Sequence, residues 1–267
     1  MNPDVAAKYA RDYIVDLAST GRYCFTSGEA RKVLDVSADA VRLALSRLAR
    51  RKLVASPARG FYVVIPPEYR SLGCLPADQF IPALMERIGR HYYAGLLSAA
   101  QYHGAAHHRP QGFQIMLGKA RRPIRCGQVR AAFIVRKELE KVPVQMFNTP
   151  RGTLRVSTPE ATAVDLVGYP RHVGGLDQVA TLLSELAEQM DPLKLVEAVK
   201  AVPVTWAQRL GYLLEQVDAG EKTAELKGYV RDTARDAVAL LPGAAHGKAR
   251  PDPAWKLYVN ADVEPEF

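Results

Sequence analysis

The sequence is poor in cysteine, and its few cysteines follow no recurrent spacing. Cys24, Cys74 and Cys126 are odd in number, which does not favour a framework of disulfides. No apolar run in the 267 residues is long enough to span a bilayer. The N-terminal stretch MNPDVAAKYARDY lacks the apolar core of a signal peptide. The sequence therefore predicts a cytoplasmic protein with reduced thiols and no membrane association.

Residues that would predict catalysis are scarce as well. No glycine-rich phosphate-binding loop occurs, and the pair Gly174 and Gly175 stands alone between expected helices. A DNA-cleaving domain needs an acidic cluster with a lysine to hold a divalent cation. The strand-rich middle of the chain has Lys119 and Arg125 but almost no carboxylates. We therefore expect no enzymatic activity and no cofactor, with a nucleic-acid enzyme as an alternative.

Three histidines form the pattern H-x3-H-H at His103, His107 and His108. This spacing could place two imidazoles on one face of a helix, as in some zinc sites. However, Gly104 and the His-Arg-Pro that follows indicate the end of a helix, and no glutamate lies between the histidines. We therefore expect no metal site.

The net charge of +8 is distributed unevenly along the chain. Residues 1–70 have 12 Lys/Arg against 7 Asp/Glu, and residues 71–155 have 13 against 4. Residues 156–267 are acidic, with 11 Lys/Arg against 17 Asp/Glu. This asymmetry indicates that the first two regions face polyanions and that the third does not.

The segment TSGEARKVLDVSADAVRLALSRLARRKLVASPARGFYVVI, residues 26–65, has the pattern of a winged helix-turn-helix. Thr26 and Glu29 have the spacing of a capping box, which predicts a helix from residue 27. After the interruption at Asp35-Val36, Ser37 is a suitable N-cap for a second helix over residues 38–52. Its apolar residues fall on one arc, which predicts a face that packs on the core: Val41, Ala44, Leu45 and Leu48.

The opposite face of this second helix carries the residues that we expect to contact DNA. In a helix-turn-helix the N-terminal part of the second helix meets base edges. Base contacts are therefore expected from Ser37, Asp39, Arg42 and Ser46. Phosphate contacts, which fix position without specifying sequence, are expected from Arg47, Arg50, Arg51 and Lys52.

Two short apolar stretches then predict the strands of the wing, at residues 53–55 and 61–65. Residues 57–60 would form its tip, where Gly60 can adopt a positive φ and Arg59 can approach a phosphate or the minor groove. Two alternatives stay open: the arginines of the helix are merely solvated, or the winged helix serves protein contact.

The chain as a whole predicts an α+β fold, in which the winged helix-turn-helix precedes a larger mixed α/β domain with a late helical bundle. The first domain would span residues 1–70, beginning with a helix over 1–19, and the second would span residues 76–267. Asp165 is expected to be a buried charge with a structural partner. Strands are expected at 113–117, 124–126, 129–135, 144–147, 153–156 and 255–259, and helices at 78–88, 92–102, 158–168, 176–189, 192–201, 205–218 and 224–240.

Residues 20–170 resemble a known family in several ordered motifs. These are the winged segment and then PPEYRSLGCLPADQFIPALM, YYAGLLSAAQYHGAAHHRPQGFQIM and RVSTPEATAVDL, and together they resemble the AbiEi-type antitoxins of bacterial type IV toxin–antitoxin systems. The resemblance implies a protein that represses its own promoter at inverted repeats of duplex DNA and belongs to phage defence. It also implies a C-terminal antitoxin domain that neutralises a nucleotidyltransferase-like toxin. We expect a monomer or weak dimer that pairs on the operator.

Basic residues of the expected strands could form one further surface that faces the toxin or a nucleic acid: Lys119, Arg121, Arg122, Arg125, Arg130 and Arg136. A solvated sheet face is an equally good interpretation of each of these residues. A repressor that responds to a metabolite is the main alternative function, and it would require a ligand pocket in the second domain.

Overall fold

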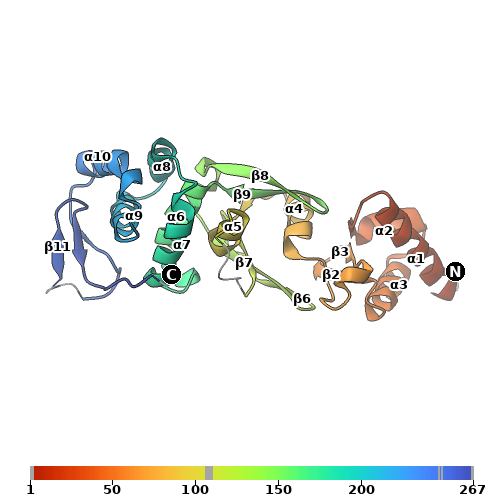
Figure 1. The fold of residues 1–267 in the computed structure, drawn as a ribbon. Coiled ribbons are helices and arrows are strands. Elements are labelled where there is room, and N and C mark those ends of the chain that lie inside the picture. Colours follow the sequence, from red (N-terminus) through yellow and green to blue (C-terminus); the bar gives the residue numbers. More distant parts are fainter. Residues whose placement is uncertain (1–2, 106–110, 246, 248, 266–267) are drawn as a thin grey trace. The chain divides into compact units, whose positions relative to one another are not determined.

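The computed structural model describes residues 3–105, 111–245, 247 and 249–265 (Figure 1). Helices and strands are mixed, in agreement with the expected α+β class. No helix of the described residues is long and apolar enough to cross a membrane. The chain divides into two compact units, Met1–Tyr92 with Gln111–Val135 and Met146–Arg155, and Tyr93–Pro110 with Arg136–Gln145 and Val156–Phe267. The predicted domains, residues 1–70 and 76–267, follow a different division and stay a prediction.

The N-terminal part of the first unit contains three helices and a three-stranded antiparallel sheet (Figure 1). Its elements are α1 (Pro3–Ser19), β1 (Cys24–Thr26), α2 (Ser27–Leu34), α3 (Ala38–Arg50), β2 (Val54–Ala58) and β3 (Phe61–Val64). The order in the sheet is β1-β3-β2, so β3 pairs with both other strands. The pattern of the sequence does not predict β1, because three residues are too few to show an alternation.

Side-chain hydrogen bonds fix the residues at which α2 and α3 begin. Thr26 Oγ1 accepts a hydrogen bond from Glu29 N at 3.0 Å, and Thr26 N donates to Glu29 Oε2 at 2.6 Å, which is the predicted capping box. Ser37 Oγ accepts a hydrogen bond from Ala40 N at 3.3 Å, as predicted. Between the helices, Asp35 has a φ of 47°, and this left-handed conformation permits the short turn.

One hydrophobic cluster packs the three helices on this sheet. Tyr13 of α1 meets Phe25 of β1 edge to face, with ring centroids 5.5 Å apart. The other buried members come from all parts of this segment: Ala10, Ile14, Leu17, Ala30, Val41, Ala44, Leu45, Leu48, Val54 and Val64. Because α3 buries its apolar face in this cluster, its polar face is left for solvent or a partner.

A six-stranded sheet has the order β6-β7-β5-β4-β9-β8. Its strands are β4 (Tyr92–Ala94), β5 (Phe113–Leu117), β6 (Ile124–Cys126), β7 (Val129–Val135), β8 (Val144–Thr149) and β9 (Gly152–Ser157). β5 and β7 are parallel, and β6 and β7 are antiparallel. All except β4 lie where the sequence predicts a strand.

The helix predicted over residues 92–102 is only partly correct. The helix, α5 (Leu96–Tyr102), begins after Gly95, and residues 92–94 form β4, in which Ala94 pairs with Val156. Short apolar runs suit a buried strand as well as a buried helix, so periodicity does not distinguish them here.

The first unit also contains the 3₁₀ helix η1 (Pro67–Tyr69) and α4 (Ala77–Arg87), which tolerates Pro82 within it. The second unit contains further helices, η2 (Leu139–Lys141), α6 (Pro159–Gly168), η3 (Pro170–His172), α7 (Leu176–Ala187), α8 (Pro192–Val199), α9 (Val204–Gln216), η4 (Gly220–Lys222) and α10 (Ala224–Thr233). Thr158 caps α6, and Asp191 caps α8, each before a proline.

The end of the second unit departs from the predicted helix over residues 224–240. α10 ends at Thr233, and β10 (Val238–Ala239) pairs in parallel with β12 (Leu257–Val259). β11 (Arg250–Asp252) completes a sheet in the order β10-β12-β11. Trp255 lies against Gly211 of α9, where its ring occupies the space of a Cβ. This close approach explains the glycine within that helix.

Candidate nucleic-acid interface

The polar face of α3 is exposed, and it carries most of the residues predicted to contact DNA. Val41, Ala44, Leu45 and Leu48 are buried on the other side of the helix. Arg47 is half-buried. The other predicted residues, on α3, at its ends and on the β2–β3 turn, are exposed: Ser37, Asp39, Arg42, Ser46, Arg50, Arg51 and Arg59. The arginines of this face are therefore accessible to a partner.

Arg42 is held only by a weak interaction. Its Nη2 lies 3.1 Å from Asp39 Oδ1, one turn earlier in the same helix. The two side chains are 81% and 87% exposed. Exposed ion pairs of this kind contribute about 0–1 kcal/mol, so Arg42 can exchange Asp39 for a base or a phosphate at little cost.

The β2–β3 turn is fixed beside the start of α2. Gly60 has a φ of 68°, which the tight turn requires and which glycine adopts without strain. Ser27 N donates a hydrogen bond to Gly60 O at 3.1 Å, and Arg87 Nη1 donates to Arg59 O at 3.2 Å. The Arg87 guanidinium also lies 5.8 Å from the centroid of the Phe61 ring. Arg59 is thereby presented from a turn that two helices hold.

The second predicted basic surface is partly present in the first unit. Lys119, Arg122, Arg125 and Arg130 are exposed, and Arg125 and Arg130 are register partners on β6 and β7. Arg121 is half-buried, with its guanidinium 5.4 Å from the centroid of the Phe133 ring. Burial lowers the pKa of Arg121, and neighbouring Arg90 lowers it further. We call the four exposed residues the strand basic surface.

The assignment of Arg136 to that surface is wrong. Its side chain is buried in the second unit, where Nε donates to Asp165 Oδ1 at 2.9 Å and Nη1 donates to Lys137 O at 2.7 Å. β7 ends at Val135, so the alternation that predicts an outward side chain does not extend to Arg136. The carboxylate beside it compensates the buried charge.

Asp165 is fully buried and has the structural partner that the sequence predicts. Its Oδ2 accepts a hydrogen bond from the Tyr93 hydroxyl at 2.7 Å, while Oδ1 accepts from Arg136. Burial raises the pKa of the Asp165 carboxyl, and Arg136 and Tyr93 oppose that shift. The Arg136 guanidinium also lies 5.5 Å from the centroid of the Trp206 ring. We call Tyr93, Arg136 and Asp165 the buried polar triad, which joins β4, the segment after β7 and α6.

The histidine pattern gives no metal site in the described residues. His103 is buried, and its Nε2 lies 2.7 Å from Ser157 O. His107 and His108 lie outside the described residues. Within the described part of the chain, no group of three or more His, Cys, Asp or Glu could hold a metal ion.

Arg151 joins three segments of the first unit, although no pattern of the sequence predicts it. It belongs to the β8–β9 turn of the first unit, and its side chain is 10% exposed. Nη1 donates to Gln79 Oε1 at 2.6 Å, and Nη2 donates to Glu68 Oε1 at 3.0 Å. The guanidinium lies 4.1 Å from the centroid of the Tyr23 ring. No local pattern could predict this, because the partners are 72 or more positions away in the sequence.

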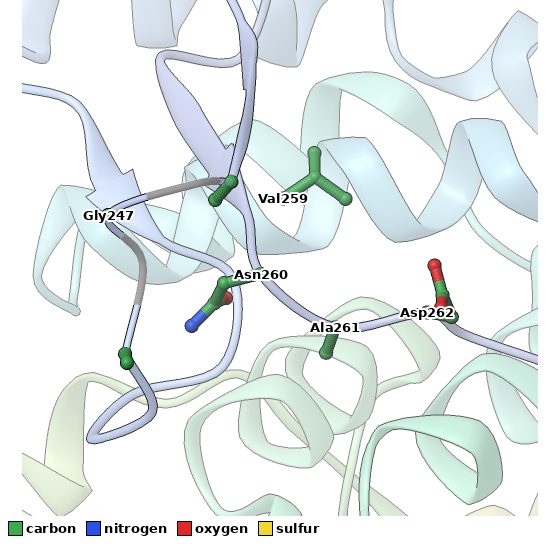
Figure 2. Close-up of a pocket in the computed structure, with 7 residues that line it drawn as sticks. Gly247, Val259, Asn260, Ala261 and Asp262 are labelled. Carbon is green, nitrogen blue, oxygen red and sulfur yellow. The ribbon is translucent and has the colours of Figure 1, made fainter.

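A pocket of about 600 Å³ lies in the second unit, and Figure 2 shows the residues that line it. The amide side chain of Asn260 lines this pocket, and both of its polar atoms form hydrogen bonds with the main chain. Oδ1 accepts from Leu241 N at 2.9 Å, and Nδ2 donates to Leu241 O at 3.1 Å. The Asn260 side chain therefore stabilises a loop rather than a ligand. The other lining residues are mostly small: Ala245, Gly247, Ala249, Val259, Ala261 and Asp262.

Comparisons with known proteins agree with the resemblance seen in the sequence. Residues 93–216 match the family model of the AbiEi antitoxin C-terminal domain. No curated protein matches the chain. Among solved structures, the chain is similar to the RV2827C protein from Mycobacterium tuberculosis, with a TM-score of 0.67 and 18% identity. That match covers 94% of this chain and 90% of the other, and it shows a common fold.

Proposed function

We propose that the chain is the antitoxin of a type IV toxin–antitoxin system, on the premise that residues 93–216 match the family model of the AbiEi antitoxin C-terminal domain. Its partner is a nucleotidyltransferase-like toxin, which it neutralises. It also represses its own operon by binding inverted repeats in the promoter. The family match is the observation that carries this proposal, since an antitoxin implies a toxin as its partner.

The proposed operator-binding part is residues 1–70, acting as a winged helix-turn-helix. Two capped helices, a short turn and a hairpin occur in the required order, and the arginines on the outer face of α3 are exposed. α3 would enter the major groove, with Ser37, Asp39, Arg42 and Ser46 at base edges. Arg47, Arg50, Arg51 and Arg59 would contact phosphates, which makes binding sensitive to salt.

Inverted repeats require two copies of the chain, one on each half-site. A protein that is monomeric or weakly dimeric in solution would pair on the operator. Cooperative binding to a two-half-site duplex, together with weak binding to a single half-site, is the expected result.

Neutralisation is tested by co-expressing the chain with its neighbouring gene, which the proposal expects to encode a nucleotidyltransferase-like toxin. Growth should be arrested by the toxin alone and restored by the wild-type chain. Restoration should persist when α3 is disabled by Arg42→Ala and Arg50→Ala, because the antitoxin function is assigned to the other part of the chain. A chain that never restores growth would refute the antitoxin proposal.

The strand basic surface is the proposed toxin-facing or nucleic-acid-facing region. Reversing the charge at Arg122, Arg125 and Arg130, all exposed, should impair either neutralisation or non-specific DNA binding. A matched control is the same reversal at exposed Arg171, Lys194 and Lys200 of the second unit. If the first triple variant behaves like the control in both assays, these residues are merely solvated.

Operator binding is tested with a labelled duplex from the upstream promoter region. The wild-type chain should shift this duplex at lower concentration than a random duplex, and added salt should weaken both complexes. Release of the operator by a small molecule, with no effect of the toxin gene, would instead support the metabolite-responsive repressor.

A further inference from the structure

A pocket of about 450 Å³ lies within the N-terminal part of the first unit, between α2, α3 and the β2–β3 turn. The first residues of α2 and of α3 form parts of its wall. Ser27 N, at the start of α2, donates to Gly60 O, so the turn and the helix are joined at the edge of this pocket. The lining residues are Ser27, Gly28, Arg31, Ala38, Val41, Arg42, Arg59, Gly60 and Tyr62.

The pocket is strongly cationic. Three different elements each contribute one arginine, Arg31 from α2, Arg42 from α3 and Arg59 from the turn. The described residues that line it include no carboxylate. Among the described residues, the side chains of Arg31 and Arg59 have no hydrogen-bond or ion-pair partner, and Arg42 has only exposed Asp39.

Glu29, the acidic residue of α2, forms its hydrogen bonds with groups that do not line the pocket. Glu29 Oε2 accepts from Thr26 N, and Glu29 Oε1 accepts from Arg22 Nη2 at 2.8 Å. It does not line the pocket, so it does not neutralise the three arginines within it. The positive charges of these guanidinium groups repel one another, and an anion bound in the pocket would offset that repulsion.

We propose that this pocket binds a phosphate group of the DNA backbone, an inference that rests on the proposed operator binding. Guanidinium groups present paired N–H donors whose geometry matches phosphate oxygens. The start of α2 adds the positive end of a helix dipole on the same side. Arg31 of α2 and Arg59 of the turn would hold this phosphate and so fix the positions of these two elements together, while Arg42 of α3 adds its charge and is left to contact a base.

This assignment adds two residues of α2, Gly28 and Arg31, to the expected DNA contacts, and neither was predicted from the sequence. Gly28 also explains how a phosphate could come close to the helix, since it has no side chain to block the approach. A Cβ added at Gly28 would meet only Thr26 Oγ1, at 3.7 Å, so larger residues fit the fold there.

Gly28 therefore provides a variant that changes the pocket without disturbing the helix. Gly28→Glu places a carboxylate in the first turn of α2, where it favours the helix dipole and replaces a poor helix former. Its thermal stability should be equal to or above that of the wild type. Its affinity for duplex DNA should fall roughly tenfold, for operator and random sequences alike, because the carboxylate repels the phosphate. Gly28→Gln, of the same size without charge, should weaken binding less than Gly28→Glu, because it narrows the approach without repelling the phosphate.

Arg31 and Lys32 provide a second matched pair on the same helix. Both are exposed, but only Arg31 lines the pocket. Arg31→Gln should reduce the slope of log affinity against log salt by about 1, the value for one phosphate contact. Lys32→Gln removes the same charge from the chain and should leave that slope nearly unchanged.

The outcomes separate this inference from the proposed function. If the wild type binds the operator and Gly28→Glu binds it equally well, the pocket inference is overturned and operator binding stands. If the wild type binds no duplex DNA even at low salt, both are overturned. If inorganic phosphate raises the Tm of the wild type but not of Gly28→Glu, while both bind DNA alike, a soluble phosphate compound is the ligand and the assignment to the DNA backbone is overturned.

Discussion

The N-terminal part of the first unit and the core of the second unit use polar side chains in opposite ways. In the N-terminal part, the hydrogen bonds that define α2 and α3 join residues three positions apart, and the arginines around them are exposed. In the second unit, Asp165 is bonded to Arg136 and Tyr93, 29 and 72 positions away, and all three are buried.

Two Asp–Arg pairs show what this difference means. Asp39 and Arg42 form an ion pair in water, which stabilises the chain little and leaves the arginine available to a ligand. Asp165 and Arg136 form an ion pair in the core, where neither charge can be removed without leaving the other uncompensated. Arginine is therefore available to a ligand in one region and has a structural role in the other.

The largest expected effect is the loss of stability on breaking the buried pair. Asp165→Ala leaves the Arg136 guanidinium buried without a counter-charge and should lower the free energy of unfolding by about 3–5 kcal/mol. Asp39→Ala removes the same side chain from the exposed pair and should change the free energy of unfolding by less than about 1 kcal/mol. Chemical denaturation of both variants measures the difference, and equal losses would remove the contrast between the two regions.

The next effect concerns DNA affinity within the exposed region. Arg42→Ala should weaken operator binding by about 1–3 kcal/mol and relax the preference for bases, since it removes a base contact. Arg50→Ala should weaken binding to operator and random duplexes alike. Titrations of both duplexes with both variants test this division. Uniform weakening by Arg42→Ala would assign that arginine to the backbone, together with Arg31 and Arg59.

A smaller effect is expected from the local capping interactions. Thr26→Ala removes the acceptor for Glu29 N and should lower the stability by about 1 kcal/mol. Thr26→Ser keeps the hydroxyl and should lose much less. Thermal unfolding of the two variants distinguishes the cap from the methyl group of Thr26, whose loss both variants share.

The smallest expected effect is a dependence of stability on pH in the same cap. Burial alone would raise the pKa of Glu29, but hydrogen bonds from Thr26 and Arg22 lower it below the ordinary value of 4.5. Since the folded state has the lower pKa, this stabilisation is complete above pH 4.5 and is lost as the pH falls through the folded value. The Tm of Glu29→Gln, measured beside the wild type, should therefore fall less on acidification. Parallel Tm curves would show that the charge of Glu29 does not stabilise the cap.

The sequence predicts the local contacts of the N-terminal part better than the long-range contacts of the second unit. The caps at Thr26 and Ser37 were predictable because donor and acceptor are close in the sequence. Asp165 was predictable as a buried charge because apolar residues surround it in its own helix. The partner Arg136 and the contacts of Arg151 were not, since burial there depends on segments that only the tertiary fold brings together. β4 was missed because Tyr92 to Ala94 are apolar in a pattern that either a helix or a strand can use.

The first unit is built from three separate stretches of the chain, and its last residue is Arg155. During synthesis, the ribosome therefore adds 63 more residues after Tyr92 before the first unit is complete. At translation speeds of about 5–20 residues per second, that delay is roughly 3–13 s. Until Arg151 is added, a nascent chain has all residues of the hydrophobic cluster around α1 and α3, but Tyr23, Glu68 and Gln79 lack the side chain that contacts all three.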